Sequence, residues 1–204
     1  LPNFEILKRE LNKVGRVKLV QSAYCQYSSR YDQVLEGKLP NVFNRAFAGG
    51  CLMDINYYNI YLNVALFGKP DQVIYYPNIQ DGIADTSGVA LMQYKDFVSE
   101  CTGAKDTWGV NSVQIQGEKG YIYVKDGSNG IASLKVVTKE KEEVFDEQQG
   151  ADHWMLEVRE ITRLMIADDY ESMYRRLDTM ADVIEIIEEA RYKAGIFFPG
   201  EQEN

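Results

Sequence analysis

Histidine and cysteine are scarce in this sequence, which has one histidine, His153, and three cysteines among 204 residues. The cysteines (Cys25, Cys51 and Cys101) are odd in number, widely spaced and form no C-x-x-C pair. That pattern is typical of reduced, buried thiols rather than of disulfides or a zinc site. A single imidazole also excludes metal sites and catalytic triads that need several histidines. We therefore expect a cytoplasmic protein without a bound metal.

Positive charge and long apolar runs are also limited. The chain has 22 Lys and Arg against 31 Asp and Glu, a formal net charge of −9. Binding to nucleic acid requires a dense basic patch, so no nucleic-acid partner is expected. No apolar run approaches the ~20 residues of a membrane-spanning helix, so no membrane partner is expected either. Hydrophobic residues make up 45% of the chain, which suffices for the core of one domain.

Several familiar motifs are missing as well. The chain contains no G-x-G-x-x-G turn, no G-x-x-x-x-G-K-[ST] loop and no G-x-S-x-G elbow. It begins Leu1-Pro2-Asn3, without an initiator methionine or a signal-like segment, and runs at once into the helical stretch FEILKRELNKVG. We expect the chain to be a fragment of a longer protein and to form a single domain over residues 1–204.

The hydrophobic pattern predicts an α+β fold. After the first helix it indicates a strand over residues 17–27, a polar loop over residues 28–50 and a helix over residues 51–67. A loop of that length in a compact domain often carries function. Residues 71–147 then contain seven short, mostly alternating runs with no helix between them. This arrangement is typical of an antiparallel sheet rather than of βαβ units.

Two amphipathic helices are predicted at the end of the chain, over residues 151–167 and 171–195. Their apolar stripes are Trp154, Val158, Ile161 and Met165, and Leu177, Met180, Ile184 and Ile187. We expect both stripes to cover one face of an open, mainly antiparallel sheet. The tyrosines in or beside the predicted strands include Tyr75, Tyr94, Tyr121 and Tyr123. Because too few helices remain for the second face, we predict that it uses these rings in a homodimer or homotetramer interface.

The stretch FAGGCLMDINYYNIYLNVALFGKP, residues 47–70, places a carboxylate and phenols near the start of an apolar helix. Asp54 and Tyr58 are four residues apart, so their side chains project from one helix face. A phenol has an ordinary pKa of ~10 and needs a nearby cation to act near neutral pH, whereas a carboxylate can orient a hydroxyl. Spacing alone favours a simpler alternative, a core helix in which Asp54 caps a turn and the tyrosines pack.

The longer stretch AGGCLMDINYYNIYLNVALFGKPDQV resembles the start of the main helix in the C-terminal domain of the glucose–fructose oxidoreductase, inositol dehydrogenase and MocA family. In that pattern two glycines and a short apolar pair precede an Asp, and a His or Tyr follows four positions later. VGRVKLVQSAYCQYSSRYD, VQIQGEKGYIYV and EEARYKAGIFFPGE are also similar to family segments, in the same order. The chain departs from the pattern at Cys51, where a small residue is common, and at Asn56, where Gly is usual.

This resemblance implies the substrate-binding and oligomerisation domain of an NAD(P)-dependent oxidoreductase that acts on a hydroxyl or carbonyl group of a sugar, polyol or related small molecule. Asp54 matches the motif Asp, and Tyr58 matches the proton-transfer position. The resemblance further implies an N-terminal Rossmann domain, outside this chain, that binds NAD or NADP and carries the lysine of an E-K-P segment. The chain alone is then expected to bind no cofactor and to be inactive.

Three further residues near the glycine pair are candidates for substrate contacts. Tyr27, Tyr31 and Arg45 flank or belong to the polar loop, although loop tyrosines and arginines are more often solvated or packed. An alternative function for the whole chain is a non-catalytic domain that binds a sugar derivative or mediates assembly. Asp54 and Tyr58 would then be structural.

Overall fold

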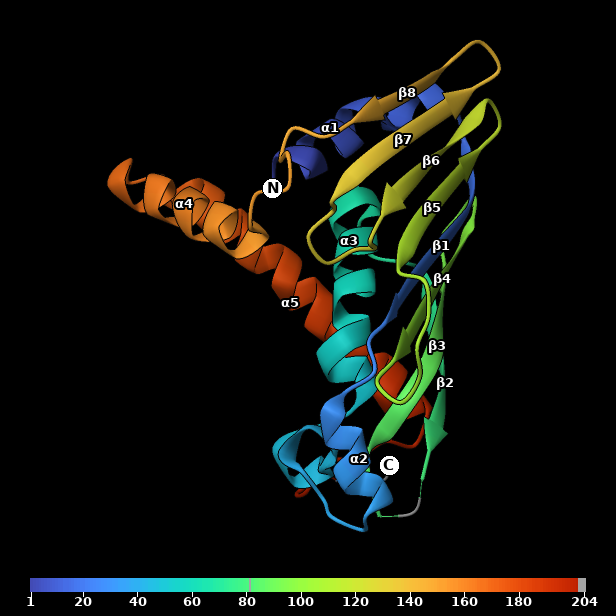
Figure 1. Cartoon of the computed structure of the whole chain (residues 1–204), viewed down its shortest axis with the longest axis vertical. Coiled ribbons are helices and arrows are strands. Elements are labelled where there is room, and N and C mark those ends of the chain that lie inside the picture. Colours follow the sequence, from blue (N-terminus) through green and yellow to red (C-terminus); the bar gives the residue numbers. More distant parts are fainter. Residues whose placement is uncertain (81, 202–204) are drawn as a thin grey trace.

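The computed structural model describes residues 1–80 and 82–201, in which helices lie on one side of an eight-stranded sheet (Figure 1). The strands are β1 (Val17–Cys25), β2 (Gln72–Ile79), β3 (Asp85–Gln93), β4 (Val98–Ala104), β5 (Ser112–Gly117), β6 (Gly120–Lys125), β7 (Ser133–Thr138) and β8 (Glu142–Phe145). The α-helices are α1 (Pro2–Glu10), α2 (Ser29–Leu35), α3 (Tyr57–Phe67), α4 (His153–Ile166) and α5 (Tyr170–Lys193). The predicted α+β fold is confirmed.

The strand order is β2-β3-β4-β1-β5-β6-β7-β8. Every neighbouring pair is antiparallel except β1 and β4, which run parallel. Their pairing continues past the strands, because the N–H groups of Gln26 and Ser28 donate to the carbonyls of Ala104 and Lys105, both at 2.8 Å. The residues that follow β1 and β4 therefore leave the sheet together at the same end.

Two groups of buried apolar residues lie on the helical side of the sheet. One joins α3 and the second half of α5 to β2 and β3, and includes Ile60, Met92 and Ile187. The other joins α1 and α3 to β5, β6 and β7. The three cysteines are free thiols, and Cys51 and Cys101 are buried.

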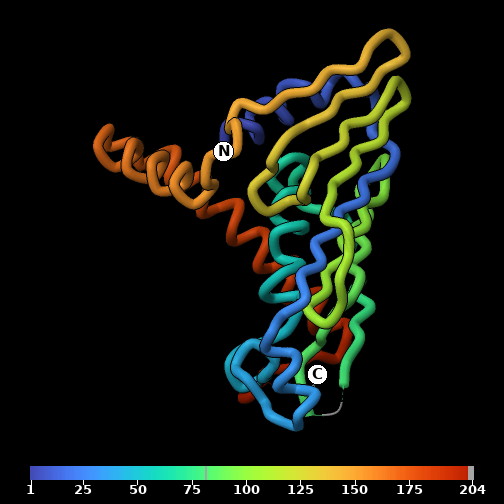
Figure 2. The backbone as a smooth tube through the Cα atoms, in the orientation of Figure 1, coloured from blue at the N-terminus to red at the C-terminus, as the bar shows by residue number. Residues whose placement is uncertain are grey.

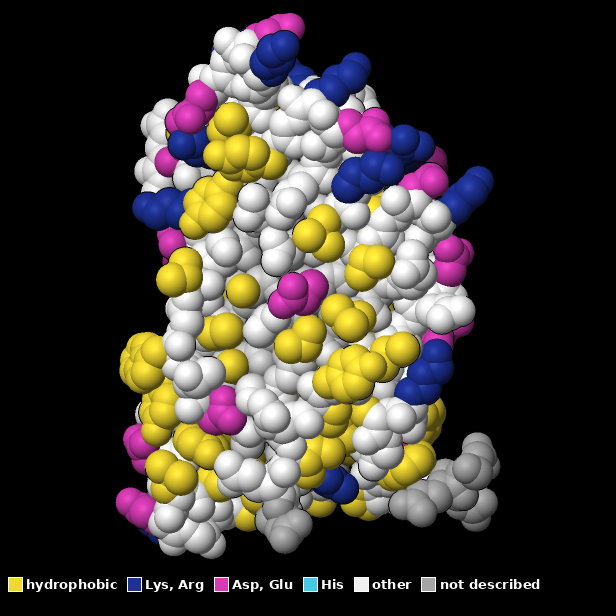
Figure 3. Space-filling view, turned by 90° about the vertical axis from the view of Figure 1, so that its right-hand side faces the viewer, with side chains coloured by type: hydrophobic (Ala, Val, Ile, Leu, Met, Phe, Trp, Pro, Cys, Tyr) yellow, Lys and Arg dark blue, Asp and Glu magenta, His cyan; other side chains and the backbone are white. Residues whose placement is uncertain are grey.

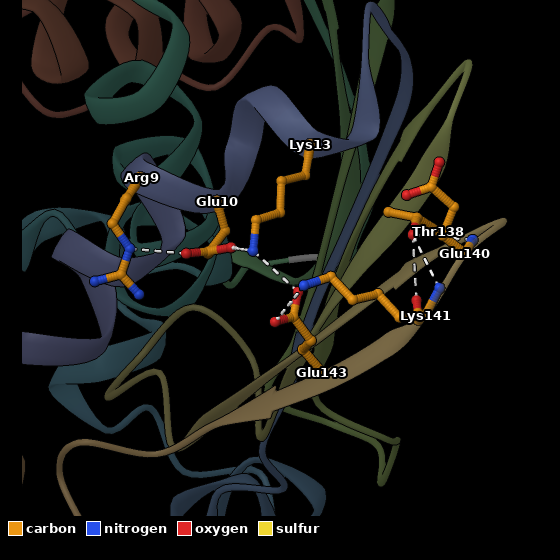
Figure 4. A network of polar contacts seen from close by, with 7 residues as sticks. All are labelled: Arg9, Glu10, Lys13, Thr138, Glu140, Lys141 and Glu143. Carbon is orange, nitrogen blue, oxygen red and sulfur yellow. Dashed lines mark hydrogen bonds and ion pairs between the residues drawn. The ribbon is translucent and has the colours of Figure 1, made fainter.

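Helix α1 and the 3-10 turn Leu11–Val14 lie at the β7–β8 end of the sheet, where charged side chains form a network (Figure 4). Lys13 contacts Glu10 and lies 2.9 Å from a carboxylate oxygen of Glu143. The pair between Lys13 and Glu143 is exposed, and exposed pairs contribute about 0–1 kcal/mol each. The stronger attachment is apolar, because Leu7 and Val14 are fully buried.

The segment over residues 28–50 is more structured than predicted, and the prediction of one long polar loop is wrong. Ser28 caps α2, since its hydroxyl accepts a hydrogen bond from the N–H of Arg30 at 3.3 Å. Two 3-10 turns follow, at Asn41–Phe43 and Arg45–Phe47. A serine at the N-cap stabilises even a short helix, and this signal was present in the sequence.

The prediction that the stripes of both C-terminal helices cover the sheet is also wrong. On α4 the exposed fraction is 53% for Trp154 and 60% for Met165. On α5 only the second half is buried, with Ile187 inside and Leu177 exposed. Figures 1 and 2 show the reason: α4 and the first turns of α5 extend away from the sheet, and α3 occupies the sheet surface instead.

Two tyrosines lie on the opposite face from the one predicted. Tyr75 and Tyr94 are 3% and 6% exposed and belong to the core under the helices. Along β2, buried Val73 and Tyr75 alternate with exposed Ile74 and Tyr76. Alternation separates the two faces of a strand but does not say which of them the helices cover.

A buried carboxylate fixes the start of the helix that carries Asp54. The side chain of Asp85, at the beginning of β3, accepts hydrogen bonds from the N–H of Leu52 at 2.8 Å and the hydroxyl of Tyr75 at 2.7 Å. Burial raises the pKa of Asp85 above its ordinary value. Gly50 makes this contact possible, because it has a φ of 136° and a Cβ there would lie 2.2 Å from a carboxylate oxygen of Asp85.

Replacing this glycine tests the anchor. We expect Gly50→Ala to lower the free energy of unfolding by about 2–4 kcal/mol, because the methyl group adds a collision to the backbone strain. Gly37→Ala is the control, since Gly37 has a φ of 80° but open space around its Cβ position. It should cost only the ~1–2 kcal/mol of backbone strain. Urea unfolding of both variants measures the difference, and equal losses would contradict the anchor.

Candidate functional site

The helix after the glycine pair starts with a π-helical turn, Leu52–Asn56, before α3 continues it. Asp54 lies in the middle of that turn, and Tyr58 is the second residue of α3. A single π-helical turn inside an α-helix is rare and is frequently found at functional sites. The turn therefore contains Asp54, one of the two residues that the sequence singled out, and it ends two residues before the other, Tyr58.

Asp54 forms an ion pair with Lys105, a residue that the sequence analysis missed. The ammonium group of Lys105 contacts a carboxylate oxygen of Asp54, donates to the carbonyl of Val42 at 3.3 Å and lies 4.9 Å from the ring centre of Phe43. The side chain of Lys105 is 2% exposed, whereas that of Asp54 is 55% exposed. A buried ammonium group needs a counter-charge. Lys105 therefore holds the carboxylate in place while a large part of it remains open to a ligand.

Tyr58 follows Asp54 by four residues and lies close enough for the Asp54 carboxylate to act on its pKa. Its ring makes edge contacts with Tyr24 and Tyr57, each with ring centres 5.7 Å apart. Burial raises the pKa of Tyr58, and the nearby Tyr24 and Asp54 raise it further. Within this chain the phenol is therefore protonated at neutral pH and can donate a proton.

Three asparagines on the buried side of the same helix bind it to the sheet. Asn56 donates to the carbonyl of Cys101 at 2.8 Å, and Asn59 donates to the carbonyl of Thr102 at 2.9 Å. Asn63 continues the row and accepts from the hydroxyl of Ser99 at 2.7 Å. Asn56 thus has a structural role at the position where the family pattern usually has Gly. Because buried polar groups cost free energy unless they are paired, this row fixes the helix against β4.

Tyr31 lies on α2 and Tyr27 just before it, and their rings make an edge contact with centres 6.0 Å apart. Tyr31 is buried, and its hydroxyl accepts a hydrogen bond from Gln80 at 2.7 Å. The hydroxyl of Tyr27 donates a hydrogen bond to a carboxylate oxygen of Asp32 at 2.6 Å. The Tyr27 ring stacks on the ring of Trp108, with ring centres 5.5 Å apart. Both hydroxyls are thus already engaged within the chain.

Arg45 lies apart from the ion pair. It lines a cavity of about 310 Å³ together with Asn44, Ile79, Gln80 and Gly82. Asp54 and Tyr58 are not among these lining residues. The structure therefore brings Asp54, Tyr58 and Lys105 together and leaves Arg45 in a separate hollow.

The start of the helix after the glycine pair is not free to bind a phosphate group. The helix N-terminus after the glycine pair is where a phosphate group would bind, but the carboxylate of Asp85 already accepts from the N–H of Leu52 there. Within residues 1–80 and 82–201, no group of three or more His, Cys, Asp and Glu side chains could hold a metal ion. Over the same residues, no helix combines the length and the apolar character needed to span a bilayer.

Residues 10–123 match the family model of the GFO/IDH/MocA C-terminal domain. Over 203 residues the chain is 31% identical to scyllo-inositol 2-dehydrogenase (NADP(+)) IolU of Bacillus subtilis, which covers 99% of this chain and 62% of that protein. Over 125 residues it is 42% identical to the uncharacterized oxidoreductase YgjR of Escherichia coli, which covers 61% of this chain and 38% of that protein. The chain thus spans less than two thirds of each of these relatives.

Solved structures with the same fold include an aldose-aldose oxidoreductase from Caulobacter crescentus complexed with glycerol. It is 17% identical with a TM-score of 0.69, over 93% of this chain and 58% of that one. A 3-ketoreductase from Actinomadura kijaniata in complex with TDP-benzene and NADP is 12% identical with a TM-score of 0.72, over 94% of this chain and 57% of that one. The fold and the family model agree with the resemblance found in the sequence. The chain belongs to the GFO/IDH/MocA family, and its Asp54–Tyr58 stretch lies within the part that matches the C-terminal domain.

Proposed function

We propose that this chain is the substrate-binding domain of an NAD(P)-dependent oxidoreductase that interconverts a hydroxyl and a carbonyl group on a sugar, polyol or related small molecule. Family membership and the names of the relatives support the reaction class. The observation that carries the proposal is the buried Lys105 that holds an exposed Asp54 beside Tyr58. In this proposal the NAD or NADP is bound by an N-terminal Rossmann domain outside this chain. IolU is long enough to contain such a domain, because the match covers only 62% of its length.

In this proposal Tyr58 carries the proton. Conversion of an alcohol to a carbonyl removes a hydride from carbon and a proton from the oxygen, so a proton-transfer group must lie within hydrogen-bond reach of that oxygen. The pKa of Tyr58, raised by burial, suits the reduction of a carbonyl, because a neutral phenol can donate its proton. In the oxidation direction Tyr58 has to accept the proton, and a neighbouring cation is required to lower the pKa of its phenol. The lysine of the N-terminal E-K-P segment would supply that cation.

Asp54 orients the substrate. An ionised carboxylate only accepts hydrogen bonds, so it suits the hydroxyl groups of a polyol or sugar. Since Lys105 holds the carboxylate, a substrate hydroxyl meets an acceptor whose position is already fixed. Such preorganisation lowers the entropy lost on binding.

The role of Tyr58 is tested by removing one oxygen atom in the full-length enzyme. We expect Tyr58→Phe to lower kcat on the order of 10²–10⁴-fold, the usual scale for an acid–base group. The melting temperature should change little because the ring remains. Tyr57→Phe is the matched control, since Tyr57 is the adjacent phenol on the same helix, and it should keep normal turnover. A folded Tyr58→Phe enzyme with normal turnover would favour the non-catalytic alternative.

Lys105 is tested as a positioning residue. We expect Lys105→Met to raise the KM for the polyol roughly tenfold, the scale of one weakened charge-assisted hydrogen bond, with a smaller change in kcat. Asp54→Asn added to Lys105→Met should then cost little more, because both changes disturb the same contact. Steady-state kinetics of the two single variants and the double variant gives the coupling. Fully additive losses would mean that Lys105 does not act through Asp54.

We further propose that the sheet face away from the helices joins two copies of the chain. Figure 3 looks onto this face and shows hydrophobic side chains across it, with most charged side chains near its edge. Ile74 and Leu91 are paired across β2 and β3, and both are exposed there, as is Tyr76. Exposed apolar patches of this kind commonly mark interfaces.

Light scattering of the full-length protein tests this interface. We expect a dimer or tetramer at micromolar concentration, and a smaller mass for the double variant Ile74→Lys, Leu91→Lys, because the introduced charges would repel across the interface. Lys18→Glu serves as the control, as it changes a charge on a different strand of the sheet. A monomeric wild-type protein, or an unchanged mass in the double variant, would contradict the proposal.

A further inference from the structure

A strained loop, residues 126–132, joins β6 to β7. Four of its residues, Asp126, Gly127, Gly130 and Ile131, have positive φ values between 48° and 96°. A β-branched residue such as Ile131 rarely adopts this left-handed backbone conformation. Such conformations persist only where surrounding contacts hold them, and they occur often at functional sites. The contacts that this loop makes therefore indicate what it does.

Buried side chains from two other segments hold the loop in place. The side-chain amide of Asn3, on α1, donates to the carbonyls of Ile131 and Ala132 at 2.8 Å and 3.0 Å. The side-chain amide of Gln148, between β8 and α4, donates to the carbonyl of Gly130 at 2.9 Å. Both side chains are buried. Because an unpaired buried amide costs free energy, these hydrogen bonds fix the backbone of the loop.

The loop in turn contacts two neighbours of Tyr58. The hydroxyl of the buried Ser128 donates to the side-chain oxygen of Asn59, the residue that follows Tyr58 in α3, at 2.7 Å. The side-chain amide of Asn129 donates to the hydroxyl of Tyr24 at 3.1 Å, and the Tyr24 ring makes the edge contact with Tyr58. In Figure 1 the loop between β6 and β7 lies against α3. Two consecutive loop residues thus bond the chain neighbour and a ring neighbour of Tyr58.

Tyr24 is the ring neighbour that comes from the sheet. Tyr57, the other ring in contact with Tyr58, belongs to the same helix. Tyr24 lies near the end of β1, and its hydroxyl also donates to the side chain of Gln26 at 3.3 Å. A hydroxyl that accepts one hydrogen bond and donates another has both of its roles engaged, which restricts the ring. The placement of the Tyr58 phenol therefore depends on where Tyr24 is held.

We propose that the β6–β7 loop positions Tyr58 for proton transfer, with Asn129 holding Tyr24 against the phenol ring and Ser128 fixing the helix at Asn59. This inference rests on the proposed function for the role of Tyr58. A proton-transfer group must lie within hydrogen-bond reach of the substrate oxygen. A misplacement of about 1 Å caused by a remote change can lower the rate on the order of 10²-fold. In this proposal Asn129 and Tyr24 are positioning residues that act through Tyr58.

Steady-state kinetics of the full-length enzyme with a polyol and NADP⁺ test this inference. We expect Asn129→Leu to lower kcat about 10- to 100-fold, because the phenol loses its fixed position. The KM for the polyol should stay within about twofold of the wild-type value, because Asp54 still orients the substrate. Tyr24→Phe removes the hydroxyl that Asn129 bonds but keeps the ring, so it should lower kcat to a similar extent. The double variant should lose little more than either single variant.

A second loop residue provides the control. Asp126 is exposed, and asparagine tolerates the left-handed conformation found there, so Asp126→Asn should keep a normal kcat. Melting temperatures are measured on all variants, and Tyr24→Phe decides the question if Asn129→Leu disturbs folding. Normal kcat in Tyr24→Phe, or fully additive losses in the double variant, would overturn the proposal.

Crystal structures of the same full-length variants separate this inference from the proposed function. The ring centres of Tyr24 and Tyr58 are 5.7 Å apart in this structure. We expect that distance to grow by about 1 Å in Asn129→Leu and to stay unchanged in Asp126→Asn. Unmoved rings would refute the positioning role even if Tyr58→Phe lowers turnover. Moved rings together with normal turnover in Tyr58→Phe would support the positioning of the ring and refute the proposed role of Tyr58.

Discussion

A buried ammonium group organises the candidate site. Lys105 follows β4, and its charge meets the carboxylate of Asp54, the carbonyl of Val42 and the ring of Phe43. These partners come from the π-helical turn and from the segment before the glycine pair, so one cation joins three separate parts of the chain. Its burial makes the pairing obligatory, because an unpaired charge in that place would cost several kcal/mol. The geometry of Asp54 thus follows from the fold.

The helix that carries the site is fixed at both its start and its side. Asp85 accepts from the N–H of Leu52 at the start, and the row of Asn56, Asn59 and Asn63 bonds its buried side to neighbouring groups of the chain. These polar contacts have few alternatives inside a core, so they specify one orientation of the helix. An exposed carboxylate and a half-buried phenol are then presented on its other side.

Much of this could be predicted from the sequence because it is local. Short-range periodicity predicts the helix after the glycine pair, the eight strands and the spacing of Asp54 and Tyr58. The helical spacing of Asn56, Asn59 and Asn63 is equally visible in the sequence, but it did not enter the prediction. Lys105 could not be singled out, since its partners Asp54 and Val42 are 51 and 63 residues away along the chain. The exposure of Trp154 could not be predicted either, because periodicity shows that a helix face is apolar but not what covers it.

We propose that Asp54 and Tyr58 contact the substrate. A crystal structure of the full-length protein with NADP⁺ and a bound polyol would show whether they do. We expect the hydroxyl at the carbon facing the nicotinamide to lie about 3 Å from the phenol oxygen of Tyr58, within hydrogen-bond reach. A second hydroxyl of the polyol should donate a hydrogen bond to the Asp54 carboxylate, and the ion pair between Asp54 and Lys105 should persist. A polyol seated against the nicotinamide that touches neither Asp54 nor Tyr58 would contradict this proposal.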